Sequence, residues 1–285
     1  MGKFIISAFA DEISADLAVQ IEILKKHRIR FMELRSIGGK NVAEFTPDEM
    51  REVKKELDRA GIAVSAIGSP IGKCKIDDDF EEEIEKFKNI IELAHILDTH
   101  YIRMFSFVLP EENDPAIYRD EVLRRWRRYV DVAKGSGLIL LHENEKNIYG
   151  DTAVRCLDLI KNMASSVVLA TFDPANFVQC GEKVFPDAFN VMDSYIGYVH
   201  IKDASIKEGI NVPAGEGDGQ ISEVLSALKE RDLFISLEPH LALFEGFANL
   251  EQGEESLAEG DRIASFATAV NALRKIMKDI GAKEG

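Results

Sequence analysis

The chain alternates eight times between a short apolar segment, rich in β-branched and aromatic residues, and a longer segment with helical periodicity. The apolar segments begin near Phe4, Arg30, Ala63, Tyr101, Leu138, Val167, Ile196 and Leu233. Parallel strands that are connected by crossover helices produce this alternation. With 46% apolar residues in a length of 285, the chain can also bury one large core. The pattern therefore predicts an α/β fold.

Capping residues mark several helix boundaries. Ser14 and the pair Thr46 and Pro47 precede helical segments, and these residue types suit the first helical turn. Gly61, Gly135 and Gly137 follow helical segments, where a left-handed residue can turn the chain into the next strand. We expect helices to begin and end at these positions.

An open doubly wound sheet and a closed barrel both accommodate eight such units. The open sheet usually has a glycine-rich first crossover, and residues 9–17, which follow the first strand, contain no glycine. The units share a pattern but no recurring sequence words, which is unlike a solenoid. No linker or low-complexity tract divides the chain. We therefore predict one domain over residues 1–285, folded as a (β/α)8 TIM barrel.

The charge of the chain excludes several classes of partner. A formal net charge of −15 repels nucleic-acid phosphates and anionic lipid surfaces unless a strong basic patch intervenes. The nearest basic cluster, residues 124–128, lies in an amphipathic helical pattern and is interpreted as a solvated face. We expect no nucleic-acid and no membrane partner.

Cysteine usage and the amino-terminal residues indicate the compartment. Cys74, Cys156 and Cys180 are odd in number and lack CxxC spacing, which argues against a disulfide framework and against a thiolate zinc site. The apolar run at residues 4–10 is too short for a signal peptide or a membrane span. These features predict a cytoplasmic protein.

Four polar residues stand at the ends of four successive predicted strands. They are Glu143, Asp173, His200 and Glu238. The carboxyl ends of barrel strands converge on one mouth, and alternation along each strand points these side chains into it. Asp173 and Glu238 also precede Pro174 and Pro239, which keep the preceding residue extended. The pattern predicts that one cation is shared by all four.

The chemistry of these four side chains indicates which cation they bind. Three carboxylates and one imidazole form an oxygen-rich set that suits Mn²⁺ or Mg²⁺, with Co²⁺ or Fe²⁺ as alternatives and Zn²⁺ less natural. Buried together, three carboxylates would repel one another and take up protons unless a divalent ion lay between them. Lys202, one side-chain step beyond His200, could offset the remaining charge.

Five short motifs resemble a known family. They are HENE (142–145), FDPAN (172–176), HIKDA (200–204), GEGDG (215–219) and LEPH (237–240). In order and content they closely resemble the sugar phosphate isomerase/epimerase family of xylose isomerase-like TIM barrels. The resemblance spans all eight units and is strongest from the fifth strand onward.

The resemblance implies one divalent metal held by Glu143, Asp173, His200 and Glu238. It also implies that Glu143 and Glu238 transfer protons at a carbon beside a carbonyl, through a metal-bound enediolate. Return of the proton to the opposite face gives an epimerase, and return to the neighbouring carbon gives an isomerase. Ketose epimerases of the family usually have a histidine where this chain has Asn176, which we expect to hydrogen-bond a substrate hydroxyl instead.

Further residues are candidates for substrate binding at the mouth. They are Glu33, Arg35, Arg103, Lys202 and His240, together with Asn176. The two arginines could hold a carboxylate or phosphate, or could form ion pairs with an acid such as Glu33 across the mouth. His142 alternates away from Glu143, and we expect it either to pack in the core or to support a ligand from behind.

The loop at residues 213–219 occupies the position where many barrels bind phosphate. Glu216 and Asp218 would oppose an anion there, which favours an unphosphorylated substrate. The simpler interpretation of the loop is a tight glycine turn, with Asp218 near the start of the next helix.

The function predicted from the sequence is a metal-dependent isomerase or epimerase of a small sugar or a polyol-derived ketone. The alternative is a dehydratase of a keto-inositol or a dehydroshikimate-like substrate on the same metal site. An endonuclease IV-like nuclease fits less well, because such enzymes use many histidines and this chain has six. A non-catalytic binding barrel and a homodimer formed through the outer helices also remain open.

Overall fold

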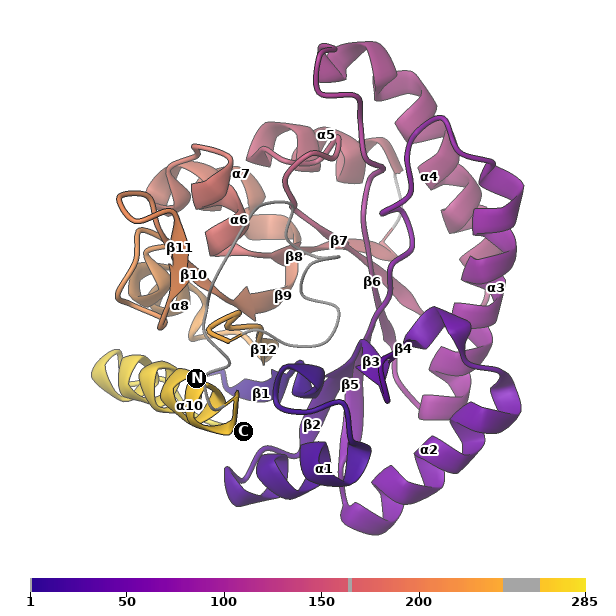
Figure 1. Ribbon diagram of the computed structural model, residues 1–285. Coiled ribbons are helices and arrows are strands. Elements are labelled where there is room, and N and C mark those ends of the chain that lie inside the picture. Colours follow the sequence, from indigo (N-terminus) through magenta and orange to yellow (C-terminus); the bar gives the residue numbers. More distant parts are fainter. Residues whose placement is uncertain (1, 164–165, 243–261) are drawn as a thin grey trace.

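Eight parallel strands form a nearly closed barrel in the computed structural model, which describes residues 2–163, 166–242 and 262–285. The strands pair in the order β1-β12-β9-β8-β7-β6-β5-β2, and β2 packs beside β1 to complete the ring (Figure 1). Their bounds are β1 Phe4–Ala8, β2 Phe31–Leu34, β5 Ala63–Gly68, β6 Tyr101–Met104, β7 Ile139–Glu143, β8 Val168–Phe172, β9 Ile196–Ile201 and β12 Leu233–Leu237. The predicted (β/α)8 barrel is confirmed.

Helices surround the barrel on its outside (Figure 1). Their bounds are α1 Leu17–Lys26, α2 Pro47–Ala60, α3 Phe80–Leu97, α4 Arg119–Ala133, α5 Ala153–Met163, α6 Pro174–Gln179, α7 Phe189–Met192, α8 Ile221–Leu228 and α10 Arg262–Asp279. Short 3-10 turns are η1 Ala10–Glu12, η2 Val42–Glu44, η3 Pro115–Tyr118 and η5 Asp193–Tyr195, and η4 Val184–Ala188 is a π-turn. Within the described residues, no helix is long and apolar enough to cross a bilayer.

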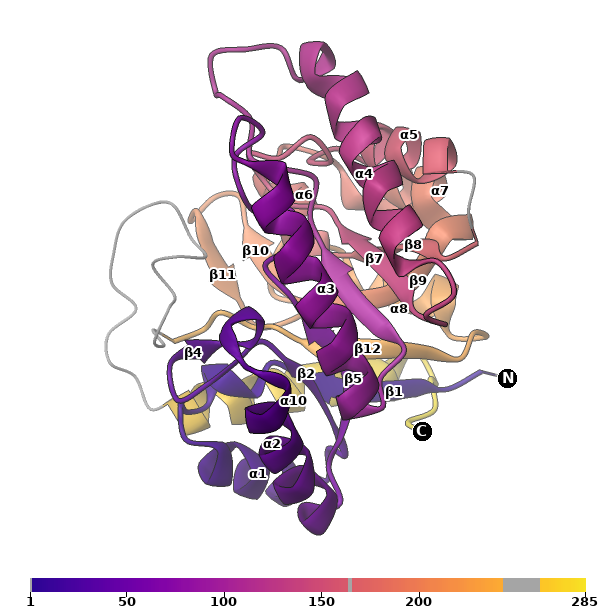
Figure 2. The ribbon, with the colours of Figure 1, turned by 90° about the vertical axis from the view of Figure 1, so that its right-hand side faces the viewer.

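Two small hairpins lie on the side of the barrel where the strands end. They are formed by β3 Ser36–Ile37 with β4 Lys40–Asn41, and by β10 Asp203–Ser205 with β11 Ile210–Val212. Both chain termini lie on the opposite side (Figure 2). There, the backbone amides of Phe4 and Gly285 each form a 2.8 Å hydrogen bond that ties β1 to the last residues of the chain.

The predicted helix boundaries are mostly confirmed. Thr46 and Glu49 form a reciprocal capping box at the start of α2, and Gly61 ends that helix with φ of 72°. The predicted start of α1 at Ser14 is wrong by two residues. The carboxylate of Asp16 accepts the amides of Ala18 and Val19, and a carboxylate at that position caps the helix directly.

The interior of the barrel is filled with apolar and aromatic side chains below the strand ends. The side chains of this layer alternate along their strands with residues that face the helices. They are Leu141, Leu169, Tyr198 and Phe234, which pack together with Tyr101. Because the side chains two positions further along β7, β8, β9 and β12 are polar, the polar groups lie directly above this apolar layer. The packed interior of the barrel therefore holds the polar residues at its mouth in fixed positions.

The basic cluster in α4 is only partly solvated. Arg124 is exposed, as predicted, but Arg125 is 7% exposed and lies over the rings of Phe80 and Phe107. The solvated interpretation is wrong for Arg125, because a guanidinium can cover aromatic rings while it bonds Glu121.

Candidate metal centre

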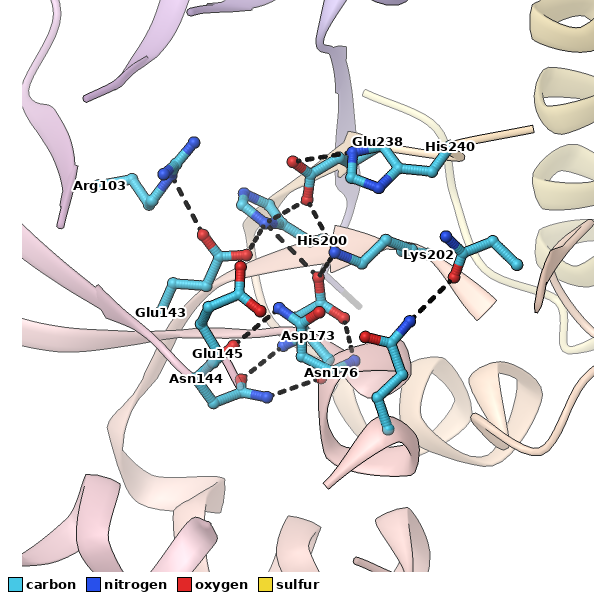
Figure 3. A network of polar contacts seen from close by, with 12 residues as sticks. Arg103, Glu143, Asn144, Glu145, Asp173, Asn176, His200, Lys202, Glu238 and His240 are labelled. Atoms are coloured by element: carbon cyan, nitrogen blue, oxygen red, sulfur yellow. Dashed lines mark hydrogen bonds and ion pairs between the residues drawn. The ribbon is translucent and has the colours of Figure 1, made fainter. Parts of the chain in front are cut away.

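The four predicted metal ligands come together at the carboxyl ends of neighbouring strands (Figure 3). Glu143 ends β7, His200 lies near the end of β9, and Asp173 and Glu238 directly follow β8 and β12. The Nδ1 atom of His200 lies 2.8 Å from Glu143 Oε1, 3.2 Å from Glu238 Oε2 and 3.9 Å from Asp173 Oδ2. One ligand atom from each residue lies within 4.8 Å of the others, so a single cation could contact all four.

The buried oxygens of this cluster fit a cation. Asp173 Oδ2 and Glu238 Oε2 are inaccessible to solvent and accept no hydrogen bond of normal geometry from the described residues. Lys202 and His200 lie near these atoms only as ion-pair partners, so both oxygens could also bind a divalent ion. Three oxygen donors and one nitrogen are ligands that a hard or borderline divalent ion accepts.

Burial and neighbouring charges act differently on the three carboxylates. Burial raises the pKa of Asp173 to about 7, although Lys202 counteracts the increase. Burial also opposes ionisation of Glu143, but His200 and Arg103 outweigh it and lower its pKa to about 2. For Glu238, Lys202 and His200 overcome burial and hold the pKa well below its usual value. Two carboxylates are therefore firmly ionised, and the third needs additional positive charge.

Lys202 supplies part of that positive charge. Its side chain is 3% exposed, and Nζ lies 3.0 Å from Asp173 Oδ2 and 3.5 Å from Glu238 Oε2. Burial disfavours the ammonium form, but Asp173 and Glu238 raise the pKa of Lys202 well above its ordinary value. Lys202 is a charged group in direct contact with two of the candidate ligands.

Glu33 on β2 and Arg103 on β6, the strand that pairs with β7, also contact the cluster. The carboxylate of Glu33 lies 3.2 Å from Nε2 of His200, so the other ring nitrogen, Nδ1, faces the carboxylate ligands. Arg103 Nε lies 3.1 Å from Glu143 Oε2 and 4.0 Å from Glu33. The arginine therefore pairs with a candidate ligand, and Glu33 contacts the ring of the candidate histidine.

Arg35 and His240 contact Glu238 from its other side. Arg35 Nη1 donates to Glu238 Oε1 at 3.0 Å, and the same guanidinium donates twice to Asp11. His240 Nε2 lies 3.6 Å from Glu238 Oε1 and 3.4 Å from Glu12, whose pKa burial raises to about 7. Sequence reasoning missed Asp11 and Glu12, although both follow the first strand as the ligands follow theirs.

Asn144 and Asn176 hold the loop that carries Asp173. The side chain of Asn144 accepts from the amide of Asp173 and donates to its carbonyl, both at 2.9 Å. Asn176 Nδ2 donates to the carbonyl of Asn144 at 2.8 Å. The role of Asn176 at a substrate hydroxyl stays a prediction. His142 points away from the cluster, as alternation predicts, and its Nε2 contacts Ser106 Oγ at 2.9 Å.

Two further charged residues border the cluster. Glu145 is buried, and its carboxylate lies 3.0 Å from Nζ of Lys73, which rests over the ring of Phe105. Neither residue was singled out from the sequence, although Glu145 belongs to the HENE motif. Together they extend the polar surface outward from the ligands.

The glycine loop at residues 213–219 is organised by Asp203. The carboxylate of Asp203 accepts the amides of Gly215, Gly217 and Gly219. The expected role of Asp218 at the start of α8 is wrong. Its Oδ2 accepts the amide of Ile206 at 2.7 Å, and α8 begins after Gln220 without a side-chain cap.

Fold and site together define an α/β barrel with a buried carboxylate–histidine centre at the carboxyl ends of its strands. The sequence matches the model of the xylose isomerase-like TIM barrel family over residues 21–275, and the chain belongs to this family.

The similar proteins include a probable epimerase, and similar structures include that of a probable dehydratase. The probable L-ribulose-5-phosphate 3-epimerase UlaE of Mycoplasma pneumoniae is 24% identical over 74% of this chain and 72% of its own length. The structure of an IOLI protein with a bound zinc atom is similar with a TM-score of 0.76 and 16% identity, covering 96% of this chain and 98% of the other. The probable 3-DHS dehydratase AsbF of Bacillus anthracis has a TM-score of 0.73 and 17% identity, covering 95% and 98%. The two structures show a shared fold.

Proposed function

We propose that the protein is a metal-dependent isomerase or epimerase of a sugar or a polyol-derived ketone. The observation that carries this proposal is the meeting of Glu143, Asp173, His200 and Glu238 within 4.8 Å. The epimerase relative supports the reaction class. We propose Mn²⁺ or Mg²⁺ as the ion, because oxygen ligands predominate.

A bound divalent ion would polarise a substrate carbonyl and its adjacent hydroxyl, and would thereby acidify the C–H bond between them. Glu143 and Glu238 are suited to move that proton. Each directs one oxygen toward His200 Nδ1 and the other toward an arginine, Arg103 or Arg35. The arginines favour the ionised carboxylate, which is the proton-accepting form. One glutamate removes the proton, and the other, once it has taken up a proton from water, returns that proton to the enediolate while the first releases its own to solvent.

The remaining predicted site residues divide into two groups in this proposal. Lys202 contacts Oε2 of Glu238 and His240 contacts its Oε1, and we assign both residues to substrate oxygens. The second group contacts the proposed metal ligands or the backbone next to them. It consists of Glu33, Arg35, Arg103 and Asn176. We propose that this second group acts on the substrate mainly by orienting the ligands.

Solvent exchange tests the proposal. A panel of free and phosphorylated ketoses in D₂O with Mn²⁺ should show deuterium at the carbon beside the carbonyl. Glu143→Gln and Glu238→Gln should each slow exchange about 10²- to 10⁴-fold, the usual contribution of a general base. Glu56→Gln, an exposed glutamate on α2, is the matched control and should exchange at the wild-type rate. Absence of exchange across the panel contradicts the proposal.

Lys202 favours a dehydratase as the second candidate. Removal of a proton beside a carbonyl can be followed by loss of a β-hydroxyl as water if an acid protonates the leaving oxygen. The ammonium of Lys202 lies 3.0 Å from Asp173 and 3.5 Å from Glu238, next to both the cation site and a proton-accepting glutamate. A new ultraviolet absorption band, from the enone that a keto-inositol would form or from the aromatic acid that 3-dehydroshikimate would form, would identify this reaction. Exchange without such a product identifies isomerisation.

A further inference from the structure

We infer that the substrate of this mouth is uncharged, and that phosphate and carboxylate groups are excluded from it. The inference rests on the proposed function and narrows it to free polyhydroxy ketones. It follows from two separate observations, one in the glycine loop and one among the charges around the metal centre.

The first observation is that an internal carboxylate fills the glycine loop. In many barrels the backbone amides of this loop bind a phosphate. Here Asp203, which is 1% exposed, accepts the amides of Gly215 at 2.8 Å, Gly217 at 3.1 Å and Gly219 at 2.8 Å. It also accepts the amide of Ala204 at 2.9 Å. These amides are already bonded to an anion, so a phosphate would find neither donors nor a favourable potential.

The glycines themselves maintain this arrangement. A Cβ atom added at Gly217 or Gly219 would collide with Oδ1 of Asp203. The outer surface of the loop is acidic as well, because the side chains of Glu216 and Asp218 are exposed. Like charges placed next to a phosphate weaken its binding.

The second observation is the excess of acidic side chains around the metal centre. Within the part of the chain that the structure describes, seven acidic residues contact one another, four lysine or arginine residues, or the histidines His200 and His240. The acidic residues are Asp11, Glu12, Glu33, Glu143, Glu145, Asp173 and Glu238, and the basic residues are Arg35, Lys73, Arg103 and Lys202. A divalent ion would offset most of this excess but leave no surplus positive charge for an anionic substrate.

Each basic residue also has an acidic partner. Arg35 bonds Asp11, and Arg103 contacts Glu143. Lys73 contacts Glu145, and Lys202 contacts Asp173. Residues 243–261, outside the described ranges, contain no lysine or arginine in their sequence. Hydroxyl groups, in contrast, can donate to the carboxylates and accept from the cations without disturbing these pairs.

Nuclear magnetic resonance of the intact protein tests the loop. With ¹⁵N-glycine labelling, the amide signals of Gly215, Gly217 and Gly219 should stay in place when inorganic phosphate is added to the wild type. A saturable shift of these three signals overturns the inference. Asp203→Asn should move the same signals upfield, because hydrogen bonds to a neutral acceptor are weaker. The exposed control Asp187→Asn should leave them unchanged. Unmoved signals in Asp203→Asn also count against the inference.

Calorimetric titration tests the whole mouth in the Mg²⁺-loaded protein. D-ribulose 5-phosphate and 3-dehydroshikimate should bind at least about tenfold more weakly than free D-ribulose, or not at all. The inference is overturned if either anion binds as tightly as the free ketose or more tightly, or less than about tenfold more weakly. These readouts do not depend on turnover. If no deuterium is exchanged while the glycine signals stay in place, the proposed reaction is rejected. The exclusion of anions is then retained.

Discussion

Replacement of Lys202 by methionine should destabilise the protein. A divalent cation should restore part of the lost stability. At an effective dielectric constant of about 20, unit charges at the observed 3.0 and 3.5 Å from Asp173 and Glu238 attract by about 5 kcal/mol each. Much of this attraction is offset by the cost of burying the ammonium, and breaking such a pair typically costs about 3–5 kcal/mol. We expect the lower value, because Asp173, whose pKa is about 7, can take up a proton.

Urea unfolding followed by circular dichroism measures this loss. With a chelator present, Lys202→Met should lower the free energy of unfolding by about 3 kcal/mol. The control Lys55→Met removes an exposed pair with Glu52 and should change it by less than about 0.5 kcal/mol. Added Mg²⁺ should stabilise Lys202→Met more than the wild type, because the ammonium no longer competes with the ion. Equal stability of variant and wild type in the chelator would refute the reasoning.

Three further predictions concern other parts of the molecule. Glu33→Gln should weaken Mn²⁺ binding about 10- to 100-fold in calorimetric titrations, because the carboxylate holds Nε2 of His200 at 3.2 Å; unchanged affinity would contradict that role. Thr46→Ala should cost about 1 kcal/mol of stability in urea unfolding, and Thr46→Ser should restore most of it. Hydrogen bonds from Arg124 lower the pKa of Glu121 to about 2 in the folded protein. The ionised carboxylate therefore stabilises the fold at any pH above its unfolded pKa of about 4.3. This stabilisation is lost as the pH falls toward 2. The melting temperatures of Glu121→Gln and wild type should therefore converge in acid, and a constant difference would disprove the assignment.

The strands and the four candidate ligands could be predicted because both depend on periodicity. Every predicted strand begins within one residue of its observed start, and alternation places Glu143, Asp173, His200 and Glu238 on the inner face of adjacent strands. Closure of the barrel then brings the strand ends together, whatever the details of the loops.

The contacts around the ligands could not be predicted in the same way. The sequence places Glu33 and Arg103 at the mouth, but only side-chain conformation decides that Arg103 pairs with Glu143 while Glu33 bonds His200. Asp203 was missed because its partners are backbone amides more than ten residues further along the chain, and backbone donors leave no signal in residue identity.

The meeting of the two chain ends has a practical consequence. Phe4 is hydrogen-bonded to both Lys283 and Gly285, and the chain ends lie on the side of the barrel away from the hairpin of β10 and β11 (Figure 2). A short peptide joining these ends would make the backbone a closed circle without stretching β1. An affinity handle or surface tether attached at this point would leave the opening of the barrel facing the solution.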